Sequence, residues 1–160
     1  MKHKMTVAVL LGLLSTSAFA EARLGLGLIA GEPTGLSVKY WLDKEHAIDG
    51  AAAWSFWDGK GFQVHGDYLW HQFDLLDDPS GFDASVPLSL GVGARLKFRE
   101  GRHRGDDDDT VFGIRVPVGV SFLFEGQPFD IFAEIVPTLD FTPAVDLNFG
   151  AAIGMRFYLE

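Results

Sequence analysis

Few residues in this chain have the types and spacing that covalent chemistry requires. His65 is followed two positions later by Asp67 and His71 by Phe73, so neither histidine stands in a His-x-Ser pair. The segment "GVSF" around Ser121 lacks the second glycine of a nucleophile elbow. Because no glycine-rich phosphate loop or metal-spaced histidine cluster occurs either, we predict no catalytic residue, no metal and no cofactor.

Charged and polar residues instead recur at alternate positions of apolar segments. In "VFGIRVPVGVSFLF" (111–124) every second residue from Phe112 is apolar, while Arg115 and Ser121 occupy alternate positions. A period of two is typical of a β-strand whose two faces meet different surroundings. Pro117 lies on the polar face and lacks an N–H group, so we expect a bulge or a missing ladder bond there.

The same alternation continues along most of the chain. Turns rich in Gly, Pro and Asp separate the alternating segments. Most segments are close to the ~9–11 residues that a tilted strand needs to cross a bilayer. We predict eight strands, at residues 23–30, 34–42, 47–57, 61–73, 86–98, 111–124, 129–137 and 145–158.

The first twenty residues have the order of features found in a secretory signal peptide. Lys2 and Lys4 precede an apolar run, and Ala18-Phe19-Ala20 supplies the small residues that a signal peptidase reads. We predict a signal peptide at residues 1–20 and one mature domain at 21–160. Loss of the two lysines changes the formal net charge of −9 to −11.

Composition excludes several classes of function. A strongly acidic chain is a poor partner for nucleic acid, whose phosphates require Lys and Arg. The absence of cysteine excludes a disulfide framework and a thiolate metal site. After residue 20 no run of about 18 uncharged apolar residues occurs, so the sequence contains no candidate transmembrane helix.

The polar face of the strands has two possible environments. It meets water in a soluble lipocalin-like binder, whereas it lines the interior of an outer-membrane barrel. Here it is rich in Gly, Ala and Ser, which fit a narrow interior, and its acidic and basic residues balance. We therefore expect a lumen charge network of Lys39, Asp49, Asp67, Arg95, Lys97, Arg115, Asp130, Glu134, Asp146 and Arg156.

Aromatic residues favour the membrane environment. Most Trp and Tyr residues lie near strand ends, as in the girdles at the two membrane interfaces. The predicted girdle residues are Tyr40, Trp54, Phe56 and Tyr158. A Lys or Arg that faces lipid at the midplane costs about 2–4 kcal/mol, and several would exceed a net stability of about 5–15 kcal/mol. The basic residues must therefore point inward.

Two connections carry the remaining polar residues. An even strand count places both termini on the periplasmic side and the loop at 99–110 outside the cell. Its candidates for contact with lipopolysaccharide phosphates or divalent cations are Arg102, Arg104, Asp106, Asp107, Asp108 and Asp109. The alternative is a solvated charge run, and the tripeptide Arg104-Gly105-Asp106 is too short to predict adhesion. Residues 74–85 form an unusually long periplasmic connection, which weighs against this strand count or this orientation.

Two stretches carry a resemblance to a known family. The stretch "GEPTGLSVKYWL" (31–42) is similar to the first hairpin of small uncharacterised outer-membrane barrels. The closing strand carries a Gly-x-x-apolar-x-apolar arrangement that resembles the signal for the barrel assembly machinery: Gly154, Phe157 and Leu159. Ala152 and Glu160 depart from that signal. Together with the architecture, these stretches resemble the small OmpA/OmpX-type eight-stranded outer-membrane barrels.

The resemblance implies an all-β, antiparallel, up-and-down transmembrane β-barrel of eight strands with a polar lumen filled by side chains. It implies a monomer in the outer membrane of a Gram-negative-type bacterium, with outer-membrane lipid, lipopolysaccharide and the barrel assembly machinery as partners. We expect a non-enzymatic structural or surface-interaction role. A narrow porin-like pore is the main alternative, and a lipid-modifying barrel enzyme and a soluble lipocalin-like binder also remain open.

Overall fold

The structure, a computed structural model, describes residues 23–56, 61–77, 81, 83–99 and 109–159. No helix in these ranges is long and apolar enough to cross a bilayer. The ten strands are β1 (Leu24–Gly31), β2 (Thr34–Trp41), β3 (His46–Ser55), β4 (Gly61–Gln72), β5 (Ala84–Ser85), β6 (Leu88–Arg99), β7 (Asp109–Arg115), β8 (Val118–Phe124), β9 (Phe129–Asp140) and β10 (Asp146–Leu159). The predicted signal peptide, Trp57 and most of the charged loop lie outside the described residues.

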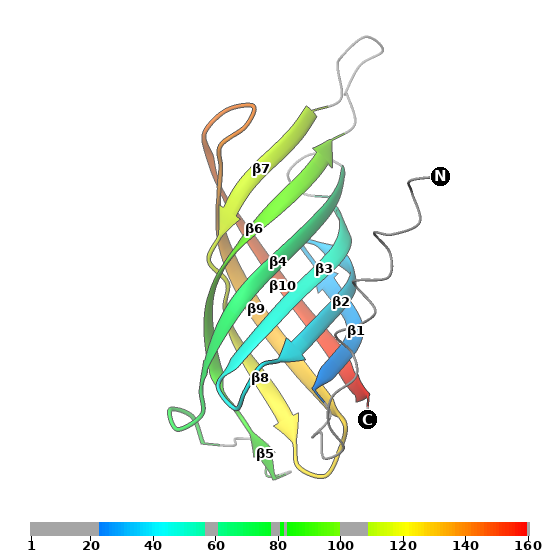
Figure 1. The fold of residues 1–160 in the computed structure, drawn as a ribbon, viewed down its shortest axis with the longest axis vertical. Coiled ribbons are helices and arrows are strands. Elements are labelled where there is room, and N and C mark those ends of the chain that lie inside the picture. The colour runs from blue at the N-terminus through cyan, green and yellow to red at the C-terminus, as the bar shows by residue number, and fades with distance from the viewer. Residues whose placement is uncertain (1–22, 57–60, 78–80, 82, 100–108, 160) are drawn as a thin grey trace, which may run out of the picture.

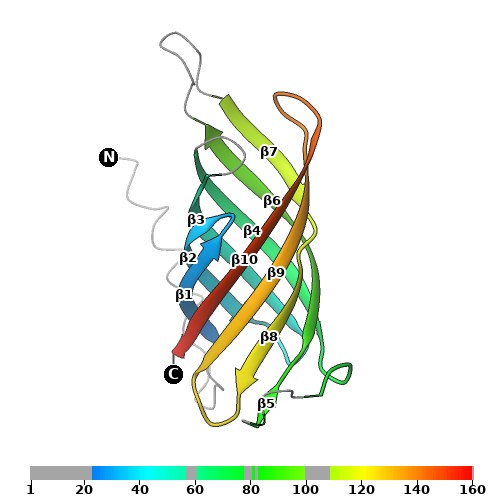
Figure 2. The same cartoon turned by 180° about the vertical axis from the view of Figure 1, so that it is seen from behind.

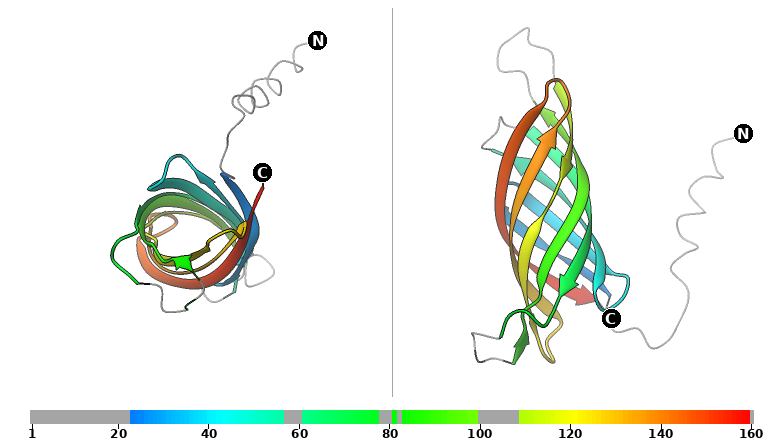
Figure 3. Two further views of the ribbon diagram at one scale, coloured as in Figure 1. Left: turned by 90° about the horizontal axis from the view of Figure 1, so that it is seen from below. Right: turned by 90° about the vertical axis from the view of Figure 1, so that its left-hand side faces the viewer.

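Antiparallel pairing closes the sheet into a ring (Figures 1 and 2). Strand β1 pairs with β2, β2 with β3, β3 with β4, and β4 with β6. Strand β6 pairs with both β7 and β8, each of these pairs with β9, and β9 pairs with β10. Strand β10 then pairs with β1, and Leu24 lies opposite Leu159. Seen along its axis, the ring surrounds an interior (Figure 3). Because β1 begins where β10 finishes, we call this the terminal end, and the end that carries the β1–β2 turn the far end.

The strand register gives the ring a defined stagger. A path of paired Cα atoms leads from Leu26 to Leu147 on β10 through Val38, Gly50, Gly66, Ala94, Ile114 and Leu139. Leu26 itself pairs with Phe157 on β10, ten residues from Leu147. With about 3.3 Å per residue and about 4.8 Å between strands, this stagger tilts the strands by about 41°.

Two prolines explain why ten strands appear where eight were predicted. Pro117 separates β7 from β8, yet both strands pair with β6 and β9 in one unbroken register. The expected effect of Pro117 is therefore a missing ladder bond and not a bulge. Pro87 separates β5 from β6 in the same way, and both pair with β8 in one register. Each interrupted pair occupies one position in the ring.

The two faces of the strands differ in exposure as the alternation predicts. Leu36 and Ile153 point outward with 64% and 63% of their surface exposed. Arg115 and Ser121 are buried on the inner face, and Val116 between them is exposed on the outer face. The ring therefore encloses a polar interior behind an apolar outer wall. This polar interior is the opposite of an ordinary soluble core.

Candidate functional site: the charged interior

The strand alternation brings most of the predicted charge network into the interior. Eight of its ten residues are buried, namely Lys39, Asp49, Asp67, Arg95, Lys97, Arg115, Asp130 and Arg156. The side chain of Glu134 is 9% exposed. Asp146 is exposed, so its assignment to the network was wrong. Asp146 begins β10 at the far end, beyond Gly31, where β1 no longer lies beside it to cover its side chain.

Arg115 is the central cation of the network. Its Nε atom lies 2.9 Å from Asp67 Oδ1, and its Nη2 atom lies 3.6 Å from Glu134 Oε1. The contacts are ionic and poorly aligned as hydrogen bonds, since Nε and Nη2 make none of good geometry. Arg115 thus links β4 to β9 across the interior and holds two carboxylates that are shielded from water.

Arg156 occupies a second interior site, nearer the terminal end. Its Nε donates to Ser37 Oγ at 2.9 Å and its Nη2 donates to Asp49 Oδ2 at 2.9 Å. Its guanidinium lies 3.8 Å from the ring centre of Phe132, which is a cation–π distance. These contacts join β10 to β2, β3 and β9 through one side chain.

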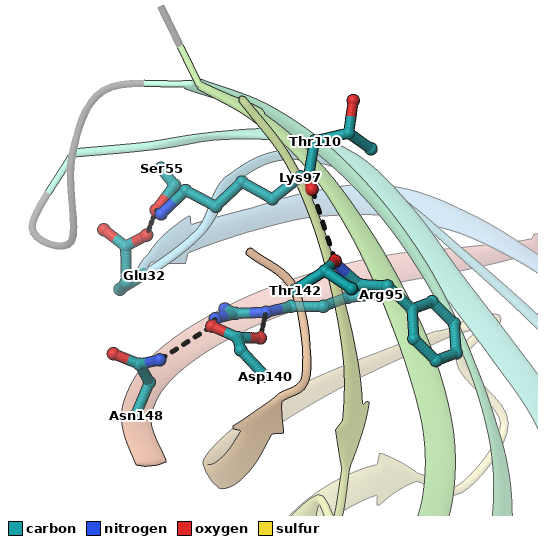
Figure 4. Close-up of polar contacts among 9 residues, drawn as sticks. Glu32, Ser55, Arg95, Lys97, Thr110, Asp140, Thr142 and Asn148 are labelled. Carbon is teal, nitrogen blue, oxygen red and sulfur yellow. Dashed lines mark hydrogen bonds and ion pairs between the residues drawn. The ribbon is translucent and has the colours of Figure 1, made fainter. Parts of the chain in front are cut away.

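At the far end, a third group of polar side chains lies under the rim (Figure 4). Arg95 binds Asp140 through two hydrogen bonds, with Nε to Oδ1 at 3.0 Å and Nη2 to Oδ2 at 2.6 Å. Asn148 donates to the same Oδ2 atom at 2.7 Å. Beside them, Lys97 Nζ donates to Ser55 Oγ at 2.7 Å, and Ser55 Oγ donates in turn to Glu32.

At the terminal end, the interior is closed by aromatic and polar side chains. Lys39 Nζ lies 2.9 Å from His71 Nε2 and 4.2 Å from the ring centre of Trp41. Trp41 Nε1 donates to Tyr158 Oη at 3.2 Å, and Tyr158 donates to Asp130 Oδ2 at 2.7 Å. Asp130 is fully buried and its other oxygen has no hydrogen-bond partner among the described residues.

We expect Tyr158→Phe to destabilise the protein, because Tyr158 makes the hydrogen bond that satisfies buried Asp130. Loss of a partner for a buried acceptor costs about 1–3 kcal/mol. Unfolding in urea, followed by tryptophan fluorescence, measures this change. Tyr40→Phe is the matched control, because Tyr40 is exposed on the outer face and removal of its hydroxyl leaves no buried carboxylate without its donor. Equal stability of the two variants would contradict the assigned role.

Several interior residues escaped the sequence prediction. Asp140 was assigned to a loop because the predicted strand ended at Pro137, but β9 continues to Asp140. The two-residue period from Asp130 would have placed Asp140 on the inner face. Glu32 was assigned to a turn, yet it is buried and accepts a hydrogen bond from the Phe56 N–H at 2.9 Å. No sequence pattern indicated that inward turn.

Three of the four predicted girdle residues face outward. Tyr40, Trp54 and Phe56 are exposed, with Tyr40 near one end of the ring and the other two near the opposite end. Tyr158 was wrongly assigned, because it shares the inner face with Arg156 and bonds Asp130. Among the charged-loop candidates, Asp109 is exposed at the start of β7. Arg102, Arg104, Asp106, Asp107 and Asp108 lie outside the described residues.

Two cavities of the interior are very small. One of about 20 Å³ lies under the far end, between Gln63, Arg95, Arg115 and Thr138. The other, of about 10 Å³, lies between Lys39, Asp49, Glu134 and Arg156. A cavity needs roughly 10–15 Å³ to hold one water molecule. Long buried side chains therefore fill the space around these contacts almost completely.

Within the described residues, the side chains with potential for chemistry, His65, Asp67 and Ser121, do not meet in one reactive centre. Asp67 contacts Arg115, while His65 Nδ1 lies 3.4 Å from Gln63 Nε2. Ser121 is buried on the inner face. No group of three His, Asp or Glu residues within the described ranges is placed to hold a metal ion. The contacts that the structure does show bind strands to one another.

Comparison with known proteins bears on the fold. No protein-family model and no curated protein matches this sequence. Among solved structures, the chain is similar to the crystal structure of the N-terminal β-barrel domain of Pseudomonas aeruginosa OprF. The TM-score is 0.63 at 12% sequence identity, and the match covers 87% of this chain and 98% of that one. The protein is therefore an all-β antiparallel protein with a fold similar to that of the OprF N-terminal β-barrel domain.

Proposed function

We propose that this protein is an outer-membrane β-barrel with a structural or surface-interaction role and no catalysis. The observation that carries the proposal is the inversion of polarity, with ion pairs inside and large apolar side chains outside. Leu28, Leu36 and Ile153 are each more than 60% exposed. A soluble protein rarely exposes a contiguous apolar patch larger than a few hundred Å², whereas a lipid-facing wall requires one.

The order of side chains along the outer wall supports embedding in a bilayer. At the far end, Trp54 lies opposite Phe62 and Phe62 opposite Phe98 on neighbouring strands. At the terminal end, Tyr40 and Trp70 are exposed on the outer face. Aliphatic residues occupy the wall between these two zones. Aromatic zones on both sides of an aliphatic band are the pattern of membrane interfaces.

Fluorescence quenching by lipid tests this placement. Variants that retain only one tryptophan are reconstituted in vesicles whose lipids carry bromine on their acyl chains. Trp54 and Trp70 face outward, so we expect strong quenching of each. Trp41 is the internal control, because it points inward and bonds Tyr158. Equal and weak quenching at all three positions would contradict a lipid-facing wall.

The filled interior favours a structural role over conduction. Arg115, Lys39, Lys97 and Gln63 are among the largest fully buried side chains, and an eight-position ring leaves an interior just wide enough for side chains. We expect no stable, reproducible conductance in planar-bilayer recordings of the purified protein. Discrete channel openings would favour the narrow-pore alternative. Lipopolysaccharide and the barrel assembly machinery remain the proposed partners, at the loops and during insertion.

A further inference from the structure

An apolar groove crosses the outer wall from β1 over β10 and β9 to β8 and the start of β6 (Figure 2). Its volume is about 730 Å³. The register sets Ala30 and Ala133 on either side of Ile153, which is 63% exposed, and Ala151 lies on the same face of β10. The strands are paired at these positions, so the hollow comes from short side chains and not from a gap in the sheet.

The lining of the groove is suited to hydrocarbon. Every side chain that lines it from the outer face belongs to Ala, Val, Leu or Ile. Glu134 also borders the groove, but its carboxylate points inward to Arg115. The volume lies within the range of roughly 300–1,000 Å³ that is usual for ligand sites. The part of a ligand that occupies the groove must therefore be apolar.

The strand register gives the height of each residue along the axis of the ring. Leu26 pairs with Phe157 on β10, whereas the path of paired residues from Leu26 round the ring reaches Leu147, nearer the far end. Steps from β1 round to β10 therefore climb towards the far end, and steps from β10 back towards β6 descend. At a tilt of about 41°, one step between strands changes the height by about 3.1 Å and one residue along a strand by about 2.5 Å.

The groove slopes down from β10 to β6. Three paired steps lead from Ala151 to Leu90 through Ile135 and Val118. Leu88 lies two residues further towards the terminal end of β6. The total descent from Ala151 to Leu88 is about 14 Å.

The lower end of the groove is level with the aromatic zone at the terminal end. Trp70 pairs with Leu90 and lies one step lower, within about 2 Å of the height of Leu88. The apolar band of an outer-membrane barrel is about 25 Å tall, so each leaflet covers about 12 Å of it. The groove therefore extends from the interface at the terminal end to just past the midplane, which is the depth of one acyl chain.

We infer that this groove holds one acyl chain of a phospholipid from the leaflet at the terminal end. The headgroup lies at the interface near Leu88, and the chain rises along Ala133 towards Ala151. In the proposed orientation this is the periplasmic leaflet, which consists of phospholipid in an outer membrane. The inference rests on the proposed membrane location and adds a bound lipid at a defined place on the wall.

Other occupants fit the groove less well. The acyl chains of lipopolysaccharide enter from the far end and cover about 12 Å of the band, so they meet only the upper end of the groove. A second copy in the same membrane orientation, related by a two-fold axis along the membrane normal, would place its own hollow against this one. A flexible acyl chain follows the sloping hollow without any change in the fold.

Native mass spectrometry of the protein, extracted from outer membranes in a mild detergent, tests the inference. We expect the unmodified protein to retain one phospholipid. Ala133→Phe fills the floor of the groove and should lower the retained fraction about ten-fold, because several methylene groups lose their contacts. Ala52→Phe is the matched control and should retain the lipid. Ala52 is, like Ala133, partly exposed on the outer face, but it lies on β3 between Leu36 and Val64, away from the groove.

The mass of the adduct identifies the occupant. Equal retention in the three proteins would overturn the inference, and so would an adduct with the mass of lipopolysaccharide or of a second chain. All three proteins should show the heat-dependent gel shift. If Ala133→Phe alone lacks it, Ala151→Leu takes its place, because it fills the upper part of the same groove. If the unmodified protein lacks the gel shift, the membrane proposal itself fails.

Discussion

Replacing Arg115 with leucine is expected to destabilise the folded ring by about 3–5 kcal/mol. Arg115 lies between Asp67 and Glu134 in the interior, and its side chain is only 2% exposed. The substitution leaves two buried carboxylates without their cation. Because net stabilities are about 5–15 kcal/mol, the loss is a large share of the total. Urea unfolding in detergent micelles, followed by tryptophan fluorescence, measures it.

Two further variants show whether the loss comes from the ion pairs. Arg23→Leu removes an exposed arginine that makes one hydrogen bond to the Leu42 carbonyl, at 3.3 Å, and should change stability little. Combining Arg115→Leu with Asp67→Asn and Glu134→Gln removes the unpaired charges and should recover part of the loss. An unfolding midpoint for Arg115→Leu equal to that of the unmodified protein would contradict a paired interior role.

A charge on the outer wall is the second substitution with a large expected effect. Leu36 is the third residue of β2, lies on the outer wall between the two aromatic zones and is 64% exposed. In a bilayer, Leu36→Arg places a charge in lipid and costs up to about 2–4 kcal/mol, the range for a basic residue at the midplane. In water the same substitution would be nearly neutral, because an exposed site loses almost no packing. Unfolding of the protein in lipid vesicles measures the cost.

Leu75→Arg is the matched control for this experiment. Leu75 is 62% exposed but lies in the connection that follows β4, outside the strands. The side chain at position 75 is as exposed as that of Leu36 but contacts water instead of acyl chains. We therefore expect little change in the free energy of unfolding. A large loss for Leu36→Arg with none for Leu75→Arg supports the lipid-facing wall. An equal loss of stability at both positions would show that the two side chains lie in the same environment, which would contradict the lipid-facing wall.

The alternation of residue types predicted which face of the segment at residues 111–124 points inward. In residues 111–124 it placed Arg115 inside and Val116 outside, and the structure agrees. The period carries this information because successive side chains of a strand point to opposite faces. It carries none about which strands meet across the interior. The contacts of Arg115 with β4 and β9 therefore depend on the register of the closed ring.

The errors have identifiable causes. Pro137 was treated as the end of a strand, but in β9 its carbonyl accepts the Val116 N–H at 2.9 Å and the ladder continues to Asp140. Tyr158 was assigned to a girdle from its position near a strand end, although the alternation placed it with Arg156 on the inner face. Asp146 has the correct alternation but lies beyond the hairpin that would have covered it. The local alternation determines which face of the strand a side chain lies on, whereas the neighbouring strands determine whether that side chain is buried.

The place where the β1–β2 turn meets β10 could not be predicted from sequence for the same reason. The turn at residues 31–33 was recognised, but its height relative to β10 depends on the ten-residue stagger of the ring. Stagger is a property of the complete circuit of pairings. A single pair of strands does not determine it.

The central claim is that the protein is a folded barrel in the outer membrane, and heat-dependent migration on a gel tests it most directly. Outer-membrane fractions are dissolved in sodium dodecyl sulfate and run with and without boiling. We predict that the protein is recovered in this fraction and that the unboiled band migrates differently from the boiled one, because the closed hydrogen-bonded ring resists the detergent until heated. Recovery as a soluble protein without detergent, with no change in migration on boiling, would contradict the account.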